Sequence, residues 1–417
     1  MSYLDPCSCL FMDSGGGWSG SGGGKGSFIH FGEPRGSLYS ENGLVTVRTE
    51  IGSSQTSRDP LLILEGYLSE GYTAAGYIGY EYSAYTDTGF IPARIKEGDR
   101  FPDMKFLLFR DEDITTGDSA ELKFELGRQG HVPDNLKYGH EAVHELRSNM
   151  SRDEYVKMVG LAKRYIKYGD IYQVNLSQRY TVDYRLPAIE YFLRLFHVQQ
   201  VPFGCYLDFG DFQLASGSME LFLRKNGDIL TTTPIKGTMD RGNTRESDTI
   251  KKAKLVSSEK ERAENLMIVD LMRNDLSRVC RCGSVKVRRL FDVETYTTLH
   301  QLVSEVEGRL KDGETIRSII KNIFPPGSVT GAPKRRALEV IDELEPHYRG
   351  PYCGAVGLFF PNGDFTLSVG IRLMVIYAGR ATFWSGGGIV WDSDPEREYE
   401  ETVLKSLAIK KAMGLTE

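Results

Sequence analysis

The stretch Ser151–Tyr184, SRDEYVKMVGLAKRYIKYGDIYQVNLSQRYTVDY, decides the fold because it joins a helix signal to a strand signal. Ser151 and Glu154 form a capping-box pattern, and apolar residues follow at helical spacing until Gly169. The residues after this glycine alternate between apolar and polar side chains, which is the period of a strand. We therefore expect a helix that begins at Ser151 and stops at Gly169, followed by a strand within residues 171–184.

Downstream of this stretch, strand signals outnumber helix signals. Short apolar or alternating runs predict strands within residues 203–216, 352–360, 364–379 and 381–391. Amphipathic runs predict long helices at Ser257–Leu276, Pro333–Leu344 and Pro395–Met413. Strands in hairpin-like succession with a few long helices between them favour an α+β fold with large antiparallel sheets over a regular βαβ alternation.

Three regions are expected along the chain. Residues 1–126 contain short apolar runs at 44–51, 61–68 and 104–112, which we interpret as strands with occasional helix. Residues 127–150 lack a sustained apolar period and predict a linker, and residues 151–414 form the main domain. The run GGGWSGSGGGKG, from Gly15 to Gly26, is not followed by the helix that a nucleotide-binding loop needs, so we expect a mobile surface loop remote from any site.

Composition excludes several classes of function. The 417 residues carry 51 Lys and Arg against 57 Asp and Glu, a formal charge of −6, and no basic block that would favour binding to nucleic acid or an anionic membrane. The sequence has no run of about 18 apolar residues, so we expect no membrane-spanning helix, and it has no basic leader of the kind that predicts secretion. Six cysteines in a chain of this length are no disulfide scaffold. We expect a cytoplasmic protein.

Two pairs of glutamates stand out as candidate metal ligands. Glu261 with Glu264, and Glu398 with Glu401, are three residues apart on two expected helices, so each pair lies on one helix face. For one pair alone, the ordinary interpretation is a solvated helix face. Two pairs on separate helices favour a hard divalent cation bound by oxygen ligands, for which Mg²⁺ is the natural choice.

Two further segments leave alternatives open. The loop Gly327–Gly331 leads into a helix expected from Pro333, so free backbone N–H groups there could bind a carboxylate or phosphate, or simply begin a helix. Lys236 lies in an apolar context, TTTPIKGTMDR, where a desolvated lysine can lose its proton and act as a nucleophile. The alternative is a solvated surface lysine.

Taken together, these segments resemble the chorismate-utilising enzymes. The resemblance runs from about Ser151 to Met413 through motifs in the family's order, namely GDIYQVNLSQR, PIKGT, ERAENLMIVDLMRNDLSRV, HQLVSEVEG, GSVTGAPKRRALEVID, YCGAVG, GIR and SGGGIVWDSDPEREYEET. Upstream, FMDSGG and GYIGYEYSAY resemble the N-terminal portion of the aminating members. The resemblance implies two facing antiparallel sheets surrounded by helices, with Mg²⁺ and chorismate in the central cleft.

The resemblance also implies roles for individual residues. Glu220 occupies the position of the general acid that protonates the departing C4 hydroxyl, although the local sequence is Ser-Met-Glu-Leu where the family usually has Ser-Pro-Glu-Arg. The four glutamates match the Mg²⁺ ligands. Residues at positions that contact the substrate are Gly237, Thr238, Gln301, Tyr352, Arg372, Gly386 and Lys405.

Two positions distinguish the members of the family. The isochorismate and salicylate enzymes use a lysine base to activate water where this chain has Gln173, and an amide cannot deprotonate water, so ammonia is the expected nucleophile. PIKGT, which contains Lys236, resembles the aminodeoxychorismate synthases, whereas anthranilate synthases usually have PIAGT. The resemblance implies that Lys236 adds to C2 as the C4 hydroxyl leaves, and that ammonia then attacks C4 and expels the lysine.

Two departures complete this interpretation. Gln301 stands where many members have a histidine, with His300 one residue earlier, and QQVPFGCYLDF at residues 199–209 departs from the NPSPYM motif that binds tryptophan. We expect an aminodeoxychorismate synthase component I that receives ammonia from a separate glutamine amidotransferase subunit and supplies 4-aminobenzoate for folate. The alternatives are anthranilate synthase component I and a non-catalytic paralogue that binds chorismate.

Overall fold

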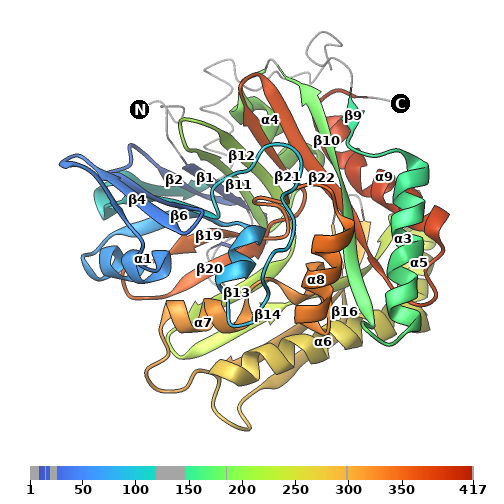
Figure 1. Cartoon of the computed structure of the whole chain (residues 1–417). Coiled ribbons are helices and arrows are strands. Elements are labelled where there is room, and N and C mark those ends of the chain that lie inside the picture. The colour runs from blue at the N-terminus through green and yellow to red at the C-terminus, as the bar shows by residue number, and fades with distance from the viewer. Residues whose placement is uncertain are drawn as a thin grey trace.

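The computed structural model describes residues 9–14, 16–18, 26–118, 146–184, 186–296 and 299–415. Two large sheets dominate the molecule, and helices pack around them (Figure 1). Neighbouring strands run antiparallel, as in the long ladder that pairs residues 174–183 with residues 380–389. The α+β fold with large antiparallel sheets is therefore confirmed.

The first sheet has ten strands among the described residues. In spatial order they are β18 (Gly331–Ala332), β10 (Gln173–Asp183), β22 (Arg380–Ile389), β21 (Leu373–Tyr377), β12 (Gln213–Ser218), β11 (Phe203–Asp208), β1 (Cys9–Asp13), β2 (Ser27–Phe31) and β8 (Ile114–Asp118), and β9 (Arg147–Ser148) pairs with β10 beside this path.

The second sheet has twelve strands in the same described part of the chain. In spatial order they are β15 (Ile235–Asp240), β17 (Leu299–Arg309), β14 (Ile229–Thr233), β13 (Leu221–Asn226), β20 (Phe365–Val369), β19 (Ala355–Phe359), β6 (Thr73–Ile78), β7 (Met104–Phe109), β3 (Gly36–Glu41), β4 (Leu44–Thr49) and β5 (Gly52–Thr56), and β16 (Lys286–Thr295) pairs with β17.

One large hydrophobic core joins the two sheets. It contains Phe11 and Leu207 from the first sheet together with Leu223 and Val306 from the second, all fully or almost fully buried. Strands from residues before position 127 lie in both sheets, so each sheet is continuous across the expected regional boundary. Residues 119–145, which include most of the expected linker, lie outside the described residues. The division into regions stays a prediction.

The helices pack around the sheets, and short 3₁₀ segments lie between strands or between a helix and a strand. The helices are α1 (Pro60–Ser69), α3 (Arg152–Lys167), α4 (Ala188–Val198), α5 (Arg245–Ser257), α6 (Glu259–Val279), α7 (Ile316–Ile323), α8 (Lys334–Leu344) and α9 (Pro395–Ala412), and the 3₁₀ segments are η2 (Tyr80–Tyr85), η3 (Asp111–Asp113) and η4 (Gly327–Val329). The expected helices at Ser257–Leu276 and Pro395–Met413 correspond to α6 and α9 within a few residues.

The helix expected at Ser151 is confirmed with its cap. The Ser151 hydroxyl accepts a hydrogen bond from the Glu154 backbone N–H at 3.3 Å, and the Glu154 carboxylate accepts one from the Ser151 N–H at 2.7 Å. Gly169 follows the helix with a φ of +80°, a conformation that suits glycine. The run at residues 61–68, by contrast, is α1 and not a strand. The missed signal was Asp59, whose carboxylate accepts from the Leu61 N–H at 3.0 Å, followed by proline in the first turn.

Removal of the Ser151 cap tests this local account. Ser151→Ala should lower the free energy of unfolding by about 1 kcal/mol, because the Glu154 N–H loses its side-chain acceptor. Urea denaturation of the two proteins measures the difference, and turnover at the site described below should not change, because the cap is exposed and Ser151 is not one of the site residues. An unchanged denaturation midpoint would show that the capping box contributes nothing to stability.

The glycine-rich stretch is only partly described, and that part is packed. Trp18 is 3% exposed; its indole N–H donates to the Gly204 carbonyl at 2.9 Å, and its ring packs edge-on against Phe203. The Asp13 carboxylate accepts from the Trp18 backbone N–H at 3.0 Å. The expectation of a mobile loop is therefore wrong for residues 16–18, because a buried indole anchors them. Gly15 and residues 19–25 lie outside the described residues.

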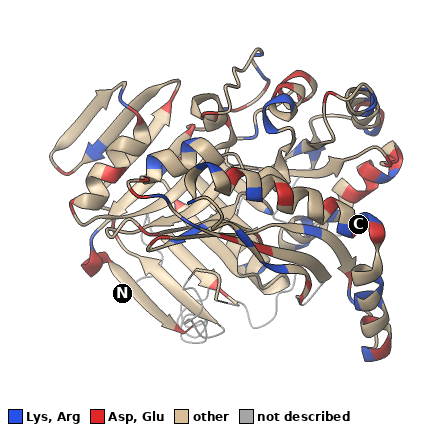
Figure 2. Cartoon of the chain, turned by 90° about the horizontal axis from the view of Figure 1, so that it is seen from below, with Lys and Arg blue, Asp and Glu red and all other residues tan. Residues whose placement is uncertain are grey.

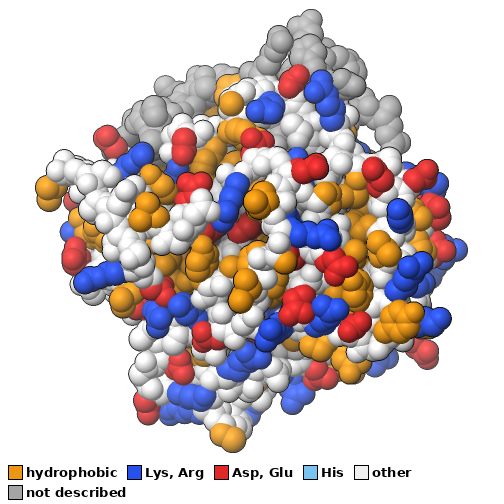
Figure 3. All heavy atoms as spheres, viewed as in Figure 1, with side chains coloured by type: hydrophobic (Ala, Val, Ile, Leu, Met, Phe, Trp, Pro, Cys, Tyr) orange, Lys and Arg blue, Asp and Glu red, His pale blue; other side chains and the backbone are white. Residues whose placement is uncertain are grey.

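The surface carries both signs of charge. Basic and acidic residues are both spread along the helices (Figure 2), and on the face shown in Figure 3 charged side chains of both signs are interspersed with scattered apolar side chains. Among the residues with described positions, no helix is both long enough and apolar enough to cross a bilayer.

Candidate active site

The candidate site lies where β10 and β22 of the first sheet meet β15 of the second. A Cβ atom added to Gly388 would lie 2.9 Å from Lys236 Nζ and 3.1 Å from Gln173 Nε2. Both side chains therefore lie over a glycine that leaves room for them. The amide of Gln173 is fully buried, and neither its nitrogen nor its oxygen has a hydrogen-bond partner among the residues that the structure describes. An unsatisfied buried amide costs free energy, so this one is suited to pair with a ligand.

The environment of Lys236 fits a nucleophilic amine. Burial lowers the pKa of its ammonium group, and the nearby Lys405 acts in the same direction, while the carboxylates of Glu264 and Glu220 oppose the shift. A lowered pKa increases the fraction of neutral amine, which is the form that can attack carbon. The solvated surface lysine that the sequence left open does not describe this side chain.

Glu220 lies beside Lys236, between β12 and β13, and is 4% exposed. Burial raises the pKa of its carboxyl to about 7, while a hydrogen bond with the Ser328 side chain, the charge of Lys236 and the Ile235 backbone N–H at 3.4 Å limit the rise. A carboxyl with this pKa is half protonated near neutrality and can donate a proton there. The arrangement therefore fits the general acid expected at this position.

The two glutamate pairs lie on α6 and α9, as expected, and each faces a strand of the site. A Cβ atom on Gly237 would lie 3.0 Å from Glu261 Oε2, and one on Gly387 would lie 3.3 Å from Glu398 Oε2. Glu264 is 3.8 Å from Lys260, and Glu401 is 2.6 Å from Lys405.

The donor set suits a hard cation in type, because carboxylate oxygens are the ligands that such a cation prefers. Among the residues that the structure describes, no group of three or more His, Cys, Asp and Glu side chains lies close enough to hold a metal. Burial, followed by the charge of Glu264, raises the pKa of Glu261, and burial with a smaller effect of Glu401 raises that of Glu398. A bound cation would offset the repulsion between these carboxylates, and carboxylate oxygens are ligands that Mg²⁺ accepts. The Mg²⁺ site stays a prediction.

Arg372, Tyr352 and Gly386 lie together and form a candidate subsite for a carboxylate. A Cβ atom on Gly386 would lie 3.0 Å from Tyr352 Oη, and Lys405 Nζ donates to the Gly386 carbonyl at 3.3 Å. Burial lowers the pKa of Arg372 to about 10, partly offset by Tyr352. Within the described residues Arg372 has no ion pair, and its guanidinium donates only a long bond to Gln199, at 3.5 Å. Such a group favours an anionic ligand.

Comparison with known proteins agrees with this geometry. The family model described as chorismate binding enzyme matches residues 48–411. The chain belongs to this family.

Individual relatives carry two different names. The chain is 40% identical to anthranilate synthase component 1 1 of Haloarcula marismortui, over 71% of this chain and 63% of that protein, so it spans less than two thirds of this relative. It is 35% identical to aminodeoxychorismate synthase component 1 of Klebsiella aerogenes, over 89% of this chain and 87% of that protein. The crystal structure of anthranilate synthase component I from Streptococcus pneumoniae superposes with a TM-score of 0.78 at 29% identity, covering 93% and 92% of the two chains.

The structure distinguishes the surroundings of the neighbouring side chains His300 and Gln301. Adjacent residues on β17 point to opposite faces. His300 is already occupied, because its Nε2 lies 2.8 Å from an Asp248 carboxylate oxygen and its Nδ1 lies 2.9 Å from the Thr295 hydroxyl. Gln301 pairs with Thr238 across the ladder, and its buried Oε1 has no hydrogen-bond partner in the described part of the chain. Gln301 is therefore available for a ligand, whereas His300 is tied to α5.

Thr238 and Gly237 differ in how they sit. Thr238 is exposed, while Gly237 adopts a φ of +87° beside Glu261. A side chain at position 237 would be strained and would crowd the carboxylate, so glycine is needed there.

The family segment GSVTGAP differs locally from the expectation. Residues 327–329 form the 3₁₀ segment η4, residues 331–332 form β18, and α8 begins at Lys334, so Pro333 precedes the first turn. Lys334 is buried and donates to Asp275 at 2.6 Å. Ser328, which sequence reasoning did not single out, contacts Glu220. The available signal for Ser328 was its place in the family motif GSVTGAP. Anion binding at the start of α8 stays a prediction.

Proposed function

We propose that the chain is an aminodeoxychorismate synthase component I, which aminates chorismate at C4 to give 4-amino-4-deoxychorismate, a precursor of 4-aminobenzoate for folate. Some relatives are named anthranilate synthase and others aminodeoxychorismate synthase, so the choice between the two activities rests on individual site residues of this chain. The observation that carries it is Lys236, an amine with a lowered pKa beside the buried Gln173 amide, which has no hydrogen-bond partner among the described residues. Without the lysine, the same site would favour the anthranilate alternative.

The chain's residues support a two-step displacement. Glu220 gives its proton to the C4 hydroxyl, which leaves as water while the neutral Lys236 amine forms a bond to C2. Ammonia then bonds to C4 as the C2–nitrogen bond to Lys236 breaks, and one proton of the new ammonium group returns to Glu220. Chorismate and ammonia thus give aminodeoxychorismate and water, and both side chains recover their starting forms.

Binding and nucleophile choice follow from the other residues. Arg372, Tyr352 and Gly386 hold the enolpyruvyl carboxylate, since an unpaired guanidinium can bind a carboxylate through two parallel hydrogen bonds. The Gln173 amide can accept a hydrogen bond from ammonia but cannot deprotonate water. Bound to Glu261, Glu264, Glu398 and Glu401, Mg²⁺ would supply Lewis-acid charge neutralisation at the ring carboxylate.

The ammonia source is a second part of the proposal. Both named relatives are described as component 1 of their synthases. We propose that a glutamine amidotransferase subunit supplies ammonia to this chain, and that free ammonium replaces it in the assay. Adding a purified amidotransferase component with glutamine should then support turnover without ammonium.

A product assay tests the proposed function. The purified chain is incubated with chorismate, Mg²⁺ and ammonium, and pyruvate release is followed with lactate dehydrogenase while chorismate is followed by chromatography. We expect ammonium-dependent loss of chorismate without pyruvate release. Stoichiometric pyruvate with anthranilate would establish the anthranilate alternative, and binding without turnover would establish the non-catalytic paralogue.

Metal dependence gives a second prediction. Chelation with EDTA should abolish turnover, and Mg²⁺ should restore it. Glu261→Gln should raise the Mg²⁺ concentration for half-maximal rate by at least about tenfold, since even groups that merely support metal ligands contribute this much. Glu339→Gln is the matched control, because Glu339 lies on α8 and pairs with Arg335 and Arg336 away from the site. An equal response of both variants would remove Glu261 from the metal site.

A further inference from the structure

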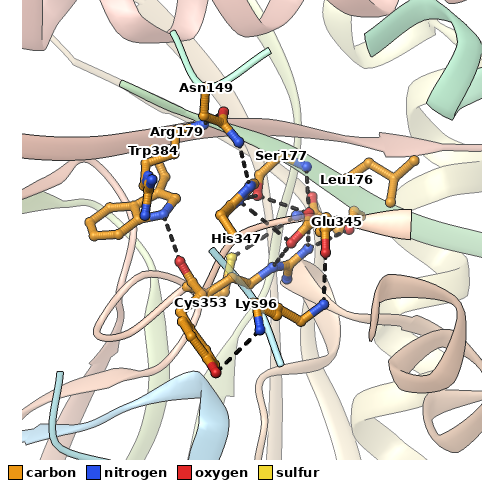
Figure 4. Close-up of polar contacts among 12 residues, drawn as sticks. Lys96, Asn149, Leu176, Ser177, Arg179, Glu345, His347, Cys353 and Trp384 are labelled. Carbon is orange, nitrogen blue, oxygen red and sulfur yellow. Dashed lines mark hydrogen bonds and ion pairs between the residues drawn. The ribbon is translucent and has the colours of Figure 1, made fainter. Parts of the chain in front are cut away.

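A buried ion pair between Glu345 and Arg349 lies behind the candidate site. Both side chains are 1% exposed. The guanidinium binds the carboxylate through two hydrogen bonds, from Nε to Oε2 at 2.8 Å and from Nη2 to Oε1 at 2.7 Å. Figure 4 shows Glu345 at the centre of a polar network with His347 and Ser177. The two parallel bonds fix the plane of the Arg349 guanidinium.

The remaining donors of Arg349 reach two segments that carry site residues. Nη1 donates to the Val329 carbonyl at 3.0 Å, and Nη2 donates to the Asn175 carbonyl at 2.7 Å. Val329 follows Ser328, whose side chain contacts Glu220. Asn175 lies two residues after Gln173 on β10, so its side chain points to the same face of the sheet. One guanidinium therefore connects the segment behind the general acid with the strand behind the amide.

Glu345 is itself fixed to the first sheet. Its Oε1 accepts from the Ser177 backbone N–H at 2.7 Å and from the Ser177 hydroxyl at 2.9 Å. Ser177 also lies 3.3 Å from His347 Nε2, and His347 Nδ1 lies 3.0 Å from the Asn149 amide nitrogen (Figure 4). Burial lowers the pKa of His347 to about 4, so the ring stays neutral beside the ion pair.

The N-terminal motif GYIGYEYSAY contacts the backbone of Arg349 and Gly350, at the start of the turn that leads to Tyr352. Glu81 accepts from the backbone N–H groups of Arg349 at 2.8 Å and Gly350 at 2.9 Å, and the Arg349 guanidinium lies 4.5 Å from the centre of the Tyr80 ring. The Tyr80 N–H donates to the Gly350 carbonyl at 2.7 Å. This second anchor does not need the Arg349 side chain, so the turn that leads to Tyr352 keeps its backbone contacts when that side chain is replaced.

We infer that Arg349 is a positioning residue for Glu220, acting through the carbonyl of Val329 and the side chain of Ser328, with Glu345 fixing the guanidinium. This inference rests on the proposed function for its kinetic consequence. A lysine cannot make all four hydrogen bonds in one plane, because its ammonium is a single point of charge. The planar fork of arginine is needed to hold two carbonyls and one carboxylate together.

A charge-neutral double replacement separates positioning from stability. Arg349→Met alone leaves Glu345 buried without its partner and should lower the melting temperature strongly. Glu345→Gln with Arg349→Met removes both charges and should recover much of that loss. The double variant should still show a kcat lower by about 10- to 100-fold, the size of effect expected when a reacting group is displaced. Its KM for chorismate should change little, because Glu81 still anchors the turn that carries Tyr352.

Asp59→Asn is the stability control. Asp59 caps α1 and pairs with Arg317 at 2.8 Å and Lys321 at 2.7 Å, so its replacement should lower the melting temperature while kcat stays unchanged. If the double variant behaves like this control, with wild-type kcat, the positioning role is overturned.

Amide hydrogen exchange keeps the test independent of turnover. In the double variant, faster exchange is expected in residues 327–331, and unchanged exchange is expected in the turn at 350–354. If the wild-type chain does not aminate chorismate, the proposed function fails, and the exchange pattern alone then decides the inference. Unchanged exchange in residues 327–331 would overturn it, because the segment would then keep its structure without the Arg349 side chain.

Discussion

Replacement of Lys236 by alanine should abolish amination of chorismate at C4. We expect kcat to fall by at least about 1,000-fold, as is typical when a covalent nucleophile is removed. The physical reason is that ammonia cannot reach C4 by the two-step route without the first bond to C2. The rate is measured at saturating chorismate, Mg²⁺ and ammonium, with chromatographic detection of the product.

Two variants control for loss of charge and loss of volume. Lys236→Met keeps the length of the stem and should be as inactive as the alanine variant. Lys225→Met removes a lysine that pairs with Asp364 at 3.1 Å near the end of β13 in the second sheet, and it should retain full activity. Wild-type rates in both Lys236 variants would make Lys236 a spectator and would favour the anthranilate alternative.

The second large effect is expected from Glu220→Gln. An amide cannot give a proton to the leaving hydroxyl, so kcat should fall by about 10²- to 10⁴-fold, the usual contribution of a general acid. Glutamine has nearly the same shape as glutamate and can still accept the hydrogen bond from the Ile235 N–H. The loss therefore reports on the proton and not on packing.

The pH profile of the wild-type chain checks the same role. Burial raises the pKa of Glu220 to about 7, so its acid form is present below that pH and is lost above it. The kcat should decline as the pH rises through about 7, and Glu220→Gln should lack this alkaline limb in its residual rate. The facing charge is that of Lys236, which opposes the rise. An alkaline limb that persists in the variant would assign it to another group.

Local signals were sufficient for elements that depend on neighbouring residues. The capping box at Ser151 and the alternation after Gly169 predicted α3 and β10, since both patterns act within a few residues. The run at 61–68 was misread because a short apolar stretch fits a strand and a buried helix equally well, and the deciding feature was the cap at Asp59.

The site was only partly within reach of the sequence. Spacing placed each glutamate pair on one helix face, and family motifs named Lys236, Glu220 and Arg372. The contact of Ser328 with Glu220 and the bonds from Arg349 to Asn175 and Val329 join segments far apart in the chain, so no local pattern predicts them. Trp18 was missed for the same reason, because glycine-rich neighbours conceal a side chain that packs against Phe203.

The most direct test of the central claim is the identity of the product made from ¹⁵N-labelled ammonium. The chain is incubated with chorismate, Mg²⁺ and the labelled salt, and the product is analysed by mass spectrometry and NMR. We expect one ¹⁵N atom bonded to C4 of a product that retains its enolpyruvyl group, with no pyruvate released. A ¹⁵N atom at C2 of an aromatic product, released together with pyruvate, would contradict it.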